Sequence, residues 1–468
     1  MSVAVTSSCL SRPAWGGFER ADAARLHEIL AAAEEILGRR TNLVSMVRGL
    51  DACRKPLVER LGARLAPTVA KALALKVLNL CLAKFHYLSR HNELLSRPFG
   101  LIVDPSNSCN LACPGCVHST RSQELKIFDW EKGLMAESRV AALFKTFGPY
   151  AIQTIFSNYG EPLMNPDTPK LIRLAKSYVM RAMLSTNMTA GRFDADALVL
   201  SGLDYIVLSI DGATQPVYEK FRRNGDIEAV FRNVRMLVEA KRRLGRQTPV
   251  IAWHFLAFEH NAHEIPQALE LARQLGVNRF ATLTPFDVSW DDPDMRPAAV
   301  RPVAVEIDPH NEAAMVGNLN SPPGGLDRTA IEREFEAGWA EKAAQIAWQG
   351  MPEGPSPVTC HWLYKSMSMD AGGRVFPCCG APTRDRNLVF AQFDGASGTD
   401  PYNSPMYRLA RSFFVNPQTS YAARQPHCVK CEWQKSTPNT DVPQVRQFLG
   451  ASAGDLFDAA SLDLLLSW

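Results

Sequence analysis

Between residues 101 and 283, short apolar runs alternate with longer segments whose apolar residues recur three or four positions apart. This alternation predicts repeated βα units, because buried parallel strands read as apolar runs and the helices that cover them are amphipathic. The expected strands are residues 101–104, 151–156, 182–185, 205–210, 250–257 and 279–283, and the expected helices include 138–147, 169–178, 227–244 and 264–275. Six such units predict an α/β fold, a partial (β/α)6 barrel of the TIM type, with its active site at the carboxyl ends of the strands.

The bulk composition limits the other classes of protein. The chain has 468 residues, with 51 basic and 48 acidic side chains, a balance that predicts no nucleic-acid partner. No basic-then-apolar signal opens the chain, and the eleven cysteines are not spread as a disulfide framework would be. We therefore expect a cytoplasmic protein in which clustered cysteines bind metal.

Residues 1–98 are expected to form an N-terminal helical region. Its most apolar part, residues 65–83, is interrupted by Pro67, Lys71 and Lys76, which disfavours a membrane span. A basic amphipathic helix can lie on a membrane surface, so peripheral membrane contact is an alternative. We favour a helix that docks on the catalytic domain.

Three cysteines, Cys109, Cys113 and Cys116, fall within eight residues directly after the first expected strand. Thiolates bind iron-sulfur clusters and zinc alike, so ligand type alone does not decide the metal. A structural zinc site needs four protein ligands, whereas this C-x3-C-x2-C spacing supplies three and would leave one iron of a cluster open. A zinc knuckle, or a zinc site completed by His118, is the alternative.

This spacing, placed after the first strand of a βα repeat, resembles the radical S-adenosylmethionine (SAM) superfamily. The resemblance covers residues 100–285 and implies a 4Fe-4S cluster on the three cysteines, with SAM bound to the open iron through its amino and carboxylate groups. Many members carry an aromatic residue just before the third cysteine, where this chain has Gly115. The adenine contact expected there must then come from backbone or from another side chain.

The resemblance also implies SAM-binding residues at later strand ends. Asn158-Tyr159-Gly160-Glu161-Pro162 looks like the family's Gly-Gly-Glu motif, with Tyr159 in place of the first glycine, and implies that the Glu161 carboxylate accepts hydrogen bonds from the SAM ammonium group. An arginine that binds the SAM carboxylate is expected at Arg222, with Arg223 as the alternative. The remaining SAM-binding candidates are Gly160, Ser185, Asn187, Ser209 and Asp211.

Five further polar residues near the fifth expected strand have less specific signals. For Asn261 and Glu264 we prefer helix capping over a role in the site. For His254, His260 and His263 we prefer hydrogen-bonded structural roles over acid-base catalysis.

A second set of cysteines lies late in the chain. Gly373 stands five residues before Cys378, and a distant C-x2-C pair follows, a pattern that resembles the auxiliary-cluster domains called SPASM and its truncated form, Twitch. The resemblance implies a second 4Fe-4S cluster bound by Cys360, Cys378, Cys428 and Cys431. Cys379 is a possible substitute ligand. No cysteine after Cys431 supplies the ligands of a full SPASM domain, which favours Twitch; a four-cysteine zinc site is the alternative.

The expected organisation is therefore an N-terminal helical region (1–98), a radical SAM partial barrel (99–285), a connector rich in Pro, Asp and Gly (286–357), and a small C-terminal iron-sulfur domain with its tail (358–468). The resemblance implies that an electron donor such as flavodoxin or ferredoxin drives cleavage of SAM to a 5'-deoxyadenosyl radical, which takes hydrogen from a substrate.

The substrate is expected to be a sugar or cyclitol, whose alcohol is oxidised with electron transfer to the auxiliary cluster. This follows from the four-cysteine spacing, which resembles that of radical SAM alcohol dehydrogenases such as the 2-deoxy-scyllo-inosamine dehydrogenase of butirosin biosynthesis. The alternatives are a peptide-modifying maturase, an enzyme for a lipid-linked substrate, and a non-catalytic iron-sulfur electron carrier.

Overall fold

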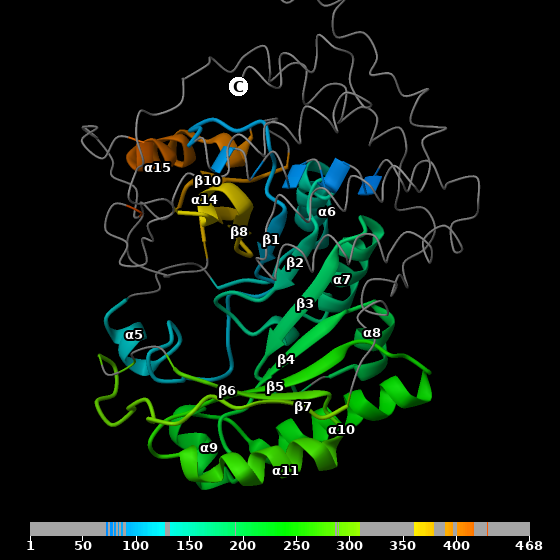
Figure 1. Ribbon diagram of the computed structural model, residues 1–468, viewed down its shortest axis with the longest axis vertical. Coiled ribbons are helices and arrows are strands. Elements are labelled where there is room, and N and C mark those ends of the chain that lie inside the picture. The colour runs from blue at the N-terminus through cyan, green and yellow to red at the C-terminus, as the bar shows by residue number, and fades with distance from the viewer. Residues whose placement is uncertain are drawn as a thin grey trace, which may run out of the picture.

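The computed structural model describes residues 90–126, 132–308 apart from 192, 286, 287 and 289, 360–378, 389–395, 400–415 and 428, with ten positions between 72 and 87. Six parallel strands follow one another in chain order (Figure 1). They are β1 Gly100–Val103, β2 Gln153–Phe156, β3 Arg181–Thr186, β4 Tyr205–Ser209, β5 Val250–Leu256 and β6 Arg279–Leu283. The expected (β/α)6 arrangement is confirmed.

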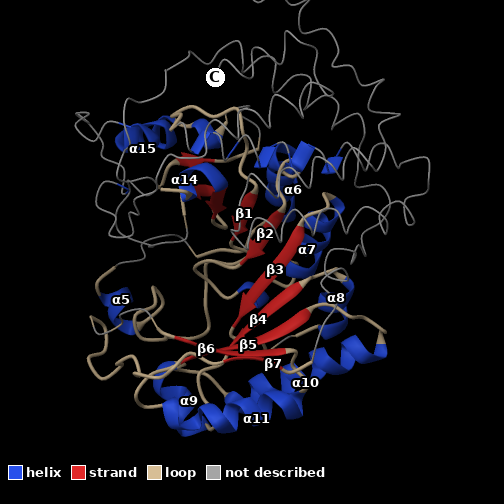
Figure 2. Cartoon of the chain, in the orientation of Figure 1, coloured by secondary structure: helices blue, strands red, loops and turns tan. Residues whose placement is uncertain are grey.

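Helices connect these strands and line the outer side of the curved sheet, as Figure 2 shows for α7, α8, α10 and α11. Their order along the chain is α5 Thr120–Glu124, α6 Glu137–Phe147, α7 Thr168–Ser177, α8 Ala195–Leu200, α9 Gln215–Phe221, α10 Ile227–Arg243 and α11 Ile265–Leu275. Local chemistry fixes their ends: the Asp226 carboxylate accepts from the first amides of α10, and Gly276 ends α11 in the left-handed conformation.

Alternate residues of the central strands differ in burial. In β3 and β4, every second side chain is buried against the helices, and those between are only half-buried. A parallel sheet covered on both faces would bury both sets. The inner face of the sheet is therefore partly open, which leaves room for a site there.

The sheet continues past β1 into the C-terminal part of the chain. After α14 Trp362–Lys365, strand β8 Ser366–Met369 pairs in parallel with β1, so that Met369 lies opposite Val103. Strands β9 Arg374–Phe376 and β10 Ala391–Gln392 follow in antiparallel order, and β7 Ala304–Glu306 closes the other end beside β6. The C-terminal strands thus share one ten-stranded sheet with the barrel.

The helical positions described between residues 72 and 87 pack against the barrel. Leu73 and Val77 are buried in the main core, and Lys76 is buried as well. The Lys76 ammonium donates to the carbonyls of Gly148 at 2.7 Å and Ala151 at 2.5 Å, which satisfies a charge that would otherwise be costly to bury. The described positions of the expected helix 65–83 therefore pack on the barrel, and its other positions lie outside the described residues. Within the described part of the chain, no helix is long and apolar enough to cross a membrane.

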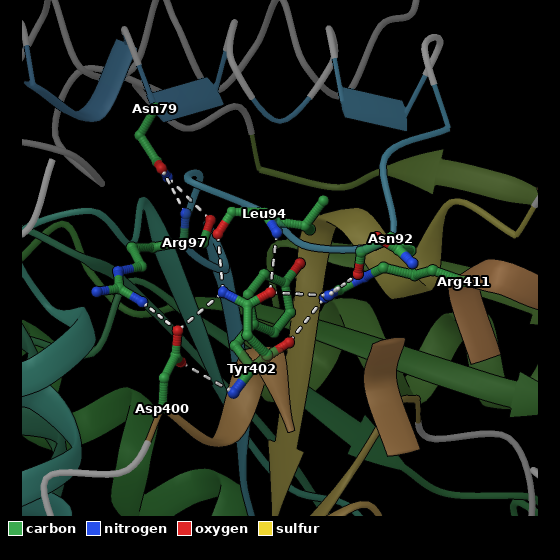
Figure 3. Close-up of polar contacts among 8 residues, drawn as sticks. Asn79, Asn92, Leu94, Arg97, Asp400, Tyr402 and Arg411 are labelled. Carbon is green, nitrogen blue, oxygen red and sulfur yellow. Dashed lines mark hydrogen bonds and ion pairs between the residues drawn. The ribbon is translucent and has the colours of Figure 1, made fainter. Parts of the chain in front are cut away.

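A polar clamp joins residues 92–97 to the C-terminal helices η5 Pro401–Asn403 and α15 Pro405–Val415 (Figure 3). The fully buried Arg411 donates to the carbonyls of Asn92, Leu363 and Tyr402. Arg97 forms an ion pair with Asp400 at 2.6 Å, and the Asn403 side chain bonds both backbone groups of Leu94. Segments far apart in sequence are thereby fixed to each other.

Candidate functional site

The three cysteines of the first set lie on the loop between β1 and α5. Cys113 is buried and the other two are partly buried, next to an apolar cluster formed by Leu111, Phe221, Phe258, Val288 and Met295. Hydrogen-bond donors point at the sulfur atoms: Leu111 N lies 3.4 Å and Asn187 Nδ2 3.7 Å from Cys109 Sγ, and Arg222 Nη1 lies 3.8 Å from Cys113 Sγ. Donors of this kind suit thiolate ligands of an iron-sulfur cluster.

Burial raises the pKa of the Cys109 thiol to about 12 and that of Cys113 to about 11, although the Arg222 charge lowers the latter. The same cause raises the pKa of Cys116. The three thiols are therefore neutral without a metal, and iron would have to replace their protons. Their position on one loop, among apolar neighbours, fits an iron-sulfur cluster that is shielded from water.

His118 does not complete a metal site here. Its Nε2 atom lies 2.8 Å from the carbonyl oxygen of Tyr159, and the imidazole is buried in that position. Among the described residues, no three His, Cys, Asp or Glu side chains lie close enough together to hold a single metal ion. The alternative of a zinc site completed by His118 does not match this geometry.

The loop after β2 packs tightly on the cysteine loop. A Cβ atom at Gly160 would lie 1.8 Å from the carbonyl oxygen of Ser106, so only glycine fits. The buried Asp104 carboxylate accepts from the amides of Tyr159 and Gly160, and the Glu161 amide donates to Ser108 O at 2.8 Å. Gly160 thus allows a close approach of two backbones. Sequence reasoning missed Asp104, which burial makes weakly acidic by raising its pKa to about 8.

Glu161 is buried between the ends of β2 and β3. Its Oε1 atom accepts from Thr186 Oγ1 at 2.6 Å and from Leu163 N at 2.9 Å, and its Oε2 atom accepts from Asn187 N at 2.7 Å. Burial raises the pKa of Glu161, while these donors oppose that change. Since Oε2 receives one donor among the described residues, it keeps acceptor capacity for an ammonium group.

Arg222, rather than Arg223, turns toward the cysteine loop. Its Nε donates to Asp211 Oδ2 at 2.5 Å, and Asp211 Oδ1 accepts from Leu256 N at 2.6 Å. Arg223 instead forms an ion pair with Asp292. Asp211 therefore serves to orient Arg222, whose remaining donors face Cys113 and can hold a carboxylate.

The polar side chains at the ends of β3, β4 and β5 lie on the open inner face. Ser185 Oγ and Ser209 Oγ are 3.5 Å apart, and Ser209 is in register with His254. Asn187 differs from them because its amide is engaged by Asn110 and Thr189 beside Cys109. Burial lowers the pKa of His254, so its imidazole is neutral near pH 7.

The prediction that Asn261 and Glu264 cap the helix that follows them is wrong. Neither side chain caps η3 Ala262–Glu264 or α11. Glu264 instead accepts from the amide of Ala213 at 2.6 Å and from the hydroxyl of Thr214, the residue just before α9, at 2.6 Å. Asn261 donates to Asp211 O at 3.0 Å and to Leu256 O at 2.9 Å. Both side chains therefore hold in place the segments that lead to Arg222 and contain Asp211. Their hydrogen bonds go to these distant partners instead of to the first amides of the helix that follows them.

The described cysteines of the second set lie next to the C-terminal strands or follow α15. Cys360 precedes α14 and β8, and Cys378 follows β9, which runs back antiparallel to β8, so both lie at the start of β8. Burial raises the pKa of Tyr407, and the thiols of Cys378 and Cys428 add to this, so both lie within electrostatic reach of that ring. Cys379 and Cys431 lie outside the described residues.

Comparison with known proteins gives four results. Residues 103–272 match the family model of the radical SAM superfamily. The chain is 29% identical over 206 residues to a GTP 3',8-cyclase of Chlorobaculum tepidum, which is 42% of this chain and 58% of the cyclase. It is 23% identical over 325 residues to a PqqA peptide cyclase of Gluconobacter oxydans, with 68% and 80% covered. SuiB of Streptococcus suis, solved with bound S-adenosylmethionine, is similar with a TM-score of 0.41 and 14% identity, over 74% of this chain and 73% of SuiB.

Proposed function

Because the chain carries a radical SAM domain, with a 4Fe-4S cluster and SAM as cofactors, we propose that it oxidises an alcohol of a sugar or cyclitol. The observation that carries the proposal is the second set of cysteines. Cys360 and Cys378 lie at one end of the β8–β9 hairpin, and β8 is hydrogen-bonded to β1, the strand that leads into Cys109.

The arrangement supports an electron-transfer role for the second site. The triad follows the carboxyl end of β1, whereas Cys360 and Cys378 lie at the opposite end of β8. One strand of four residues, roughly 13 Å long, separates the two ends. A cluster on Cys360, Cys378, Cys428 and Cys431 would therefore be near enough to the barrel to exchange electrons, yet away from the face where substrate binds.

The residues around the triad would bind and orient SAM. Cys109, Cys113 and Cys116 would hold the cluster, which would supply the electron that cleaves SAM into methionine and a 5'-deoxyadenosyl radical. The Arg222 guanidinium, held by Asp211, would bind the SAM carboxylate, and Glu161 would accept from its ammonium group. Ser185 and Ser209 would hold hydroxyl groups on the open inner face.

In the proposed oxidation, the 5'-deoxyadenosyl radical would take the hydrogen atom from the carbinol carbon and become 5'-deoxyadenosine, which would leave a carbon radical on the substrate. The substrate would then lose its hydroxyl proton to solvent and one electron to the second cluster, and the C–O single bond would become a carbonyl. The alcohol has lost two electrons, one with the hydrogen atom and one to the cluster.

The test uses the full chain, reconstituted anaerobically and supplied with SAM and dithionite. Aminocyclitols and sugars deuterated at the carbinol carbon should transfer deuterium to 5'-deoxyadenosine and give a ketone in equal amount. Cys428→Ser should still cleave SAM but should lose ketone formation. A deoxygenated or epimerised product would contradict dehydrogenation, and no 5'-deoxyadenosine at all would favour the electron carrier.

A second candidate is peptide modification, which the similarity to a PqqA peptide cyclase favours because the matched 325 residues extend beyond the radical SAM domain. A peptide substrate would use the same SAM site and the same second cluster. Deuterium transfer from a labelled peptide, with no transfer from any aminocyclitol or sugar, would select this candidate over alcohol oxidation.

A further inference from the structure

Gly115, the residue before the third cysteine, has its space taken by another part of the chain. A Cβ atom at this position would lie 2.4 Å from Val288 Cγ1, and the residue has a φ of +76°, which side chains other than glycine rarely adopt. Val288 is buried in the same apolar cluster as Leu111 and Cys113. The segment after β6 thus supplies, next to the cysteine loop, the side chain that position 115 lacks.

The same segment also makes a polar contact with the loop. The amide of Gly115 donates to Asp291 Oδ2 at 2.5 Å, which directs a carboxylate at the backbone between Cys113 and Cys116. The amides of Asp291 and Asp292 donate to Val288 O at 3.0 and 3.1 Å, so a tight turn fixes the carboxylate in this position. Asp291 is partly buried, which weakens solvent screening of its charge.

Two further contacts hold this turn in place. Asp292 forms an ion pair with Arg223. The carbonyl oxygen of Arg223 in turn accepts a hydrogen bond at 3.1 Å from the amide of Ala112, which lies in the cysteine loop. Arg121 Nη1 lies 3.4 Å from Asp291 O. The turn is therefore attached to the cysteine loop, to α5 and to the residue after Arg222, although sequence reasoning assigned it to a connector.

We propose that Val288, Asp291 and Asp292 act as a clasp on the cysteine loop, in which Asp291 positions the Gly115 amide and makes the reduction potential of the bound cluster more negative. Two physical effects act in the same direction. The negative charge of the carboxylate disfavours addition of an electron nearby. An amide that donates to Asp291 is also not free to donate to a cluster sulfur, and hydrogen bonds to sulfur raise the potential.

Asp291 is a positioning residue, because it contacts the loop backbone and not the reacting atoms. The clasp is independent of the proposed alcohol oxidation, since it concerns the first cluster alone. Failure of the oxidation test would therefore leave it standing.

The experiment compares substitutions in one loop of the full, anaerobically reconstituted chain. Asp291→Asn keeps an acceptor oxygen and removes the charge, whereas Asp291→Ala removes both. Asp294→Asn removes the charge of an exposed neighbour in the same loop and is the matched control. The readouts are the midpoint potential of the cluster whose electron paramagnetic resonance signal changes when SAM is added, and the rate at which a chelator removes iron from the protein.

Asp291→Asn should shift the midpoint potential to a more positive value with unchanged iron content. Asp291→Ala should in addition lose iron at least threefold faster, because the loop has lost its acceptor. Asp294→Asn should match the wild type in both. The proposal is overturned if Asp291→Asn leaves the potential unchanged, or if Asp294→Asn shifts it equally. Should Asp291→Ala fail to fold, the isosteric Asn variant still decides the question.

Discussion

The two cysteine sites are built in different ways. The first takes all three thiols from one loop between β1 and α5, and the neighbouring loops contribute only side chains that touch it, such as Asn187 and Arg222. The proposed second site takes its cysteines from separate segments, since Cys360 precedes α14 and β8, Cys378 follows β9, and Cys428 comes after α15. A local motif therefore defines the first site, whereas the proposed second site would depend on the pairing of the C-terminal strands with the sheet.

The strongest test of this difference is loss of one thiol from each site. Cys113→Ala should abolish release of 5'-deoxyadenosine and change thermal stability little, because the remaining loop contacts are kept. Cys360→Ala should retain SAM cleavage in the absence of substrate. Chromatography of the nucleoside products, with circular dichroism as the folding control, measures both. Release of 5'-deoxyadenosine by the Cys113 variant would show that the triad does not hold the cleaving cluster.

A substitution next to the first site tests how far its loop depends on its neighbours. Gly160→Ala should place a Cβ atom against Ser106 O, and we expect a loss of about 1–3 kcal/mol in the free energy of unfolding together with reduced iron content. Gly133→Ala is the control, since a Cβ there meets no heavy atom within 4 Å. Urea unfolding and iron analysis compare the two. Equal effects would refute the close backbone approach.

Substitutions at the adjacent Arg222 and Arg223 test whether SAM binding depends on an oriented guanidinium or only on a positive charge. Arg222→Lys should weaken SAM binding about tenfold, because lysine cannot contact Asp211 and a carboxylate together, a loss of about 1.4 kcal/mol. Arg223→Lys should change it less, since Arg223 pairs with Asp292 away from Cys113. Equilibrium binding of SAM to the reconstituted protein gives both constants. A larger effect at Arg223 would reverse the assignment.

Substitution of Asp104 is expected to have the smallest effect on SAM cleavage, because its protonation changes the free energy of unfolding and not the chemistry of the site. Burial raises its pKa to about 8, whereas an unfolded carboxyl ionises near 3.8. Between these values the folded state binds more protons, so its stability should fall as pH rises from about 4 to about 8, by at most about 1.4 kcal/mol per pH unit for this group. Asp104→Asn should flatten that slope in urea unfolding measured from pH 5 to 8. An unchanged slope would mean that other groups cause it.

The strands and the cysteine triad could be predicted from the sequence because each depends on a pattern within a short segment of the chain. Apolar runs marked β1 to β6, and the spacing of Cys109, Cys113 and Cys116 marked the cluster loop. The sequence favoured Arg222 but left Arg223 as an alternative, since a sequence pattern does not show which of two adjacent side chains turns inward. The roles of Glu264 and Asp291 depend on partners about 50 and 176 positions away, and no local pattern reports such contacts.

The parallel pairing of β8 with β1 has a consequence for biosynthesis. The edge of β1 on this side stays without its partner until residues 366–369 have left the ribosome. At about 5–20 residues per second this takes on the order of tens of seconds. During that time the nascent barrel presents an open apolar strand edge, a template for pairing with other chains. Arrival of the C-terminal strands then ends the interval of greatest aggregation risk, and the Arg411 clamp fixes them in place.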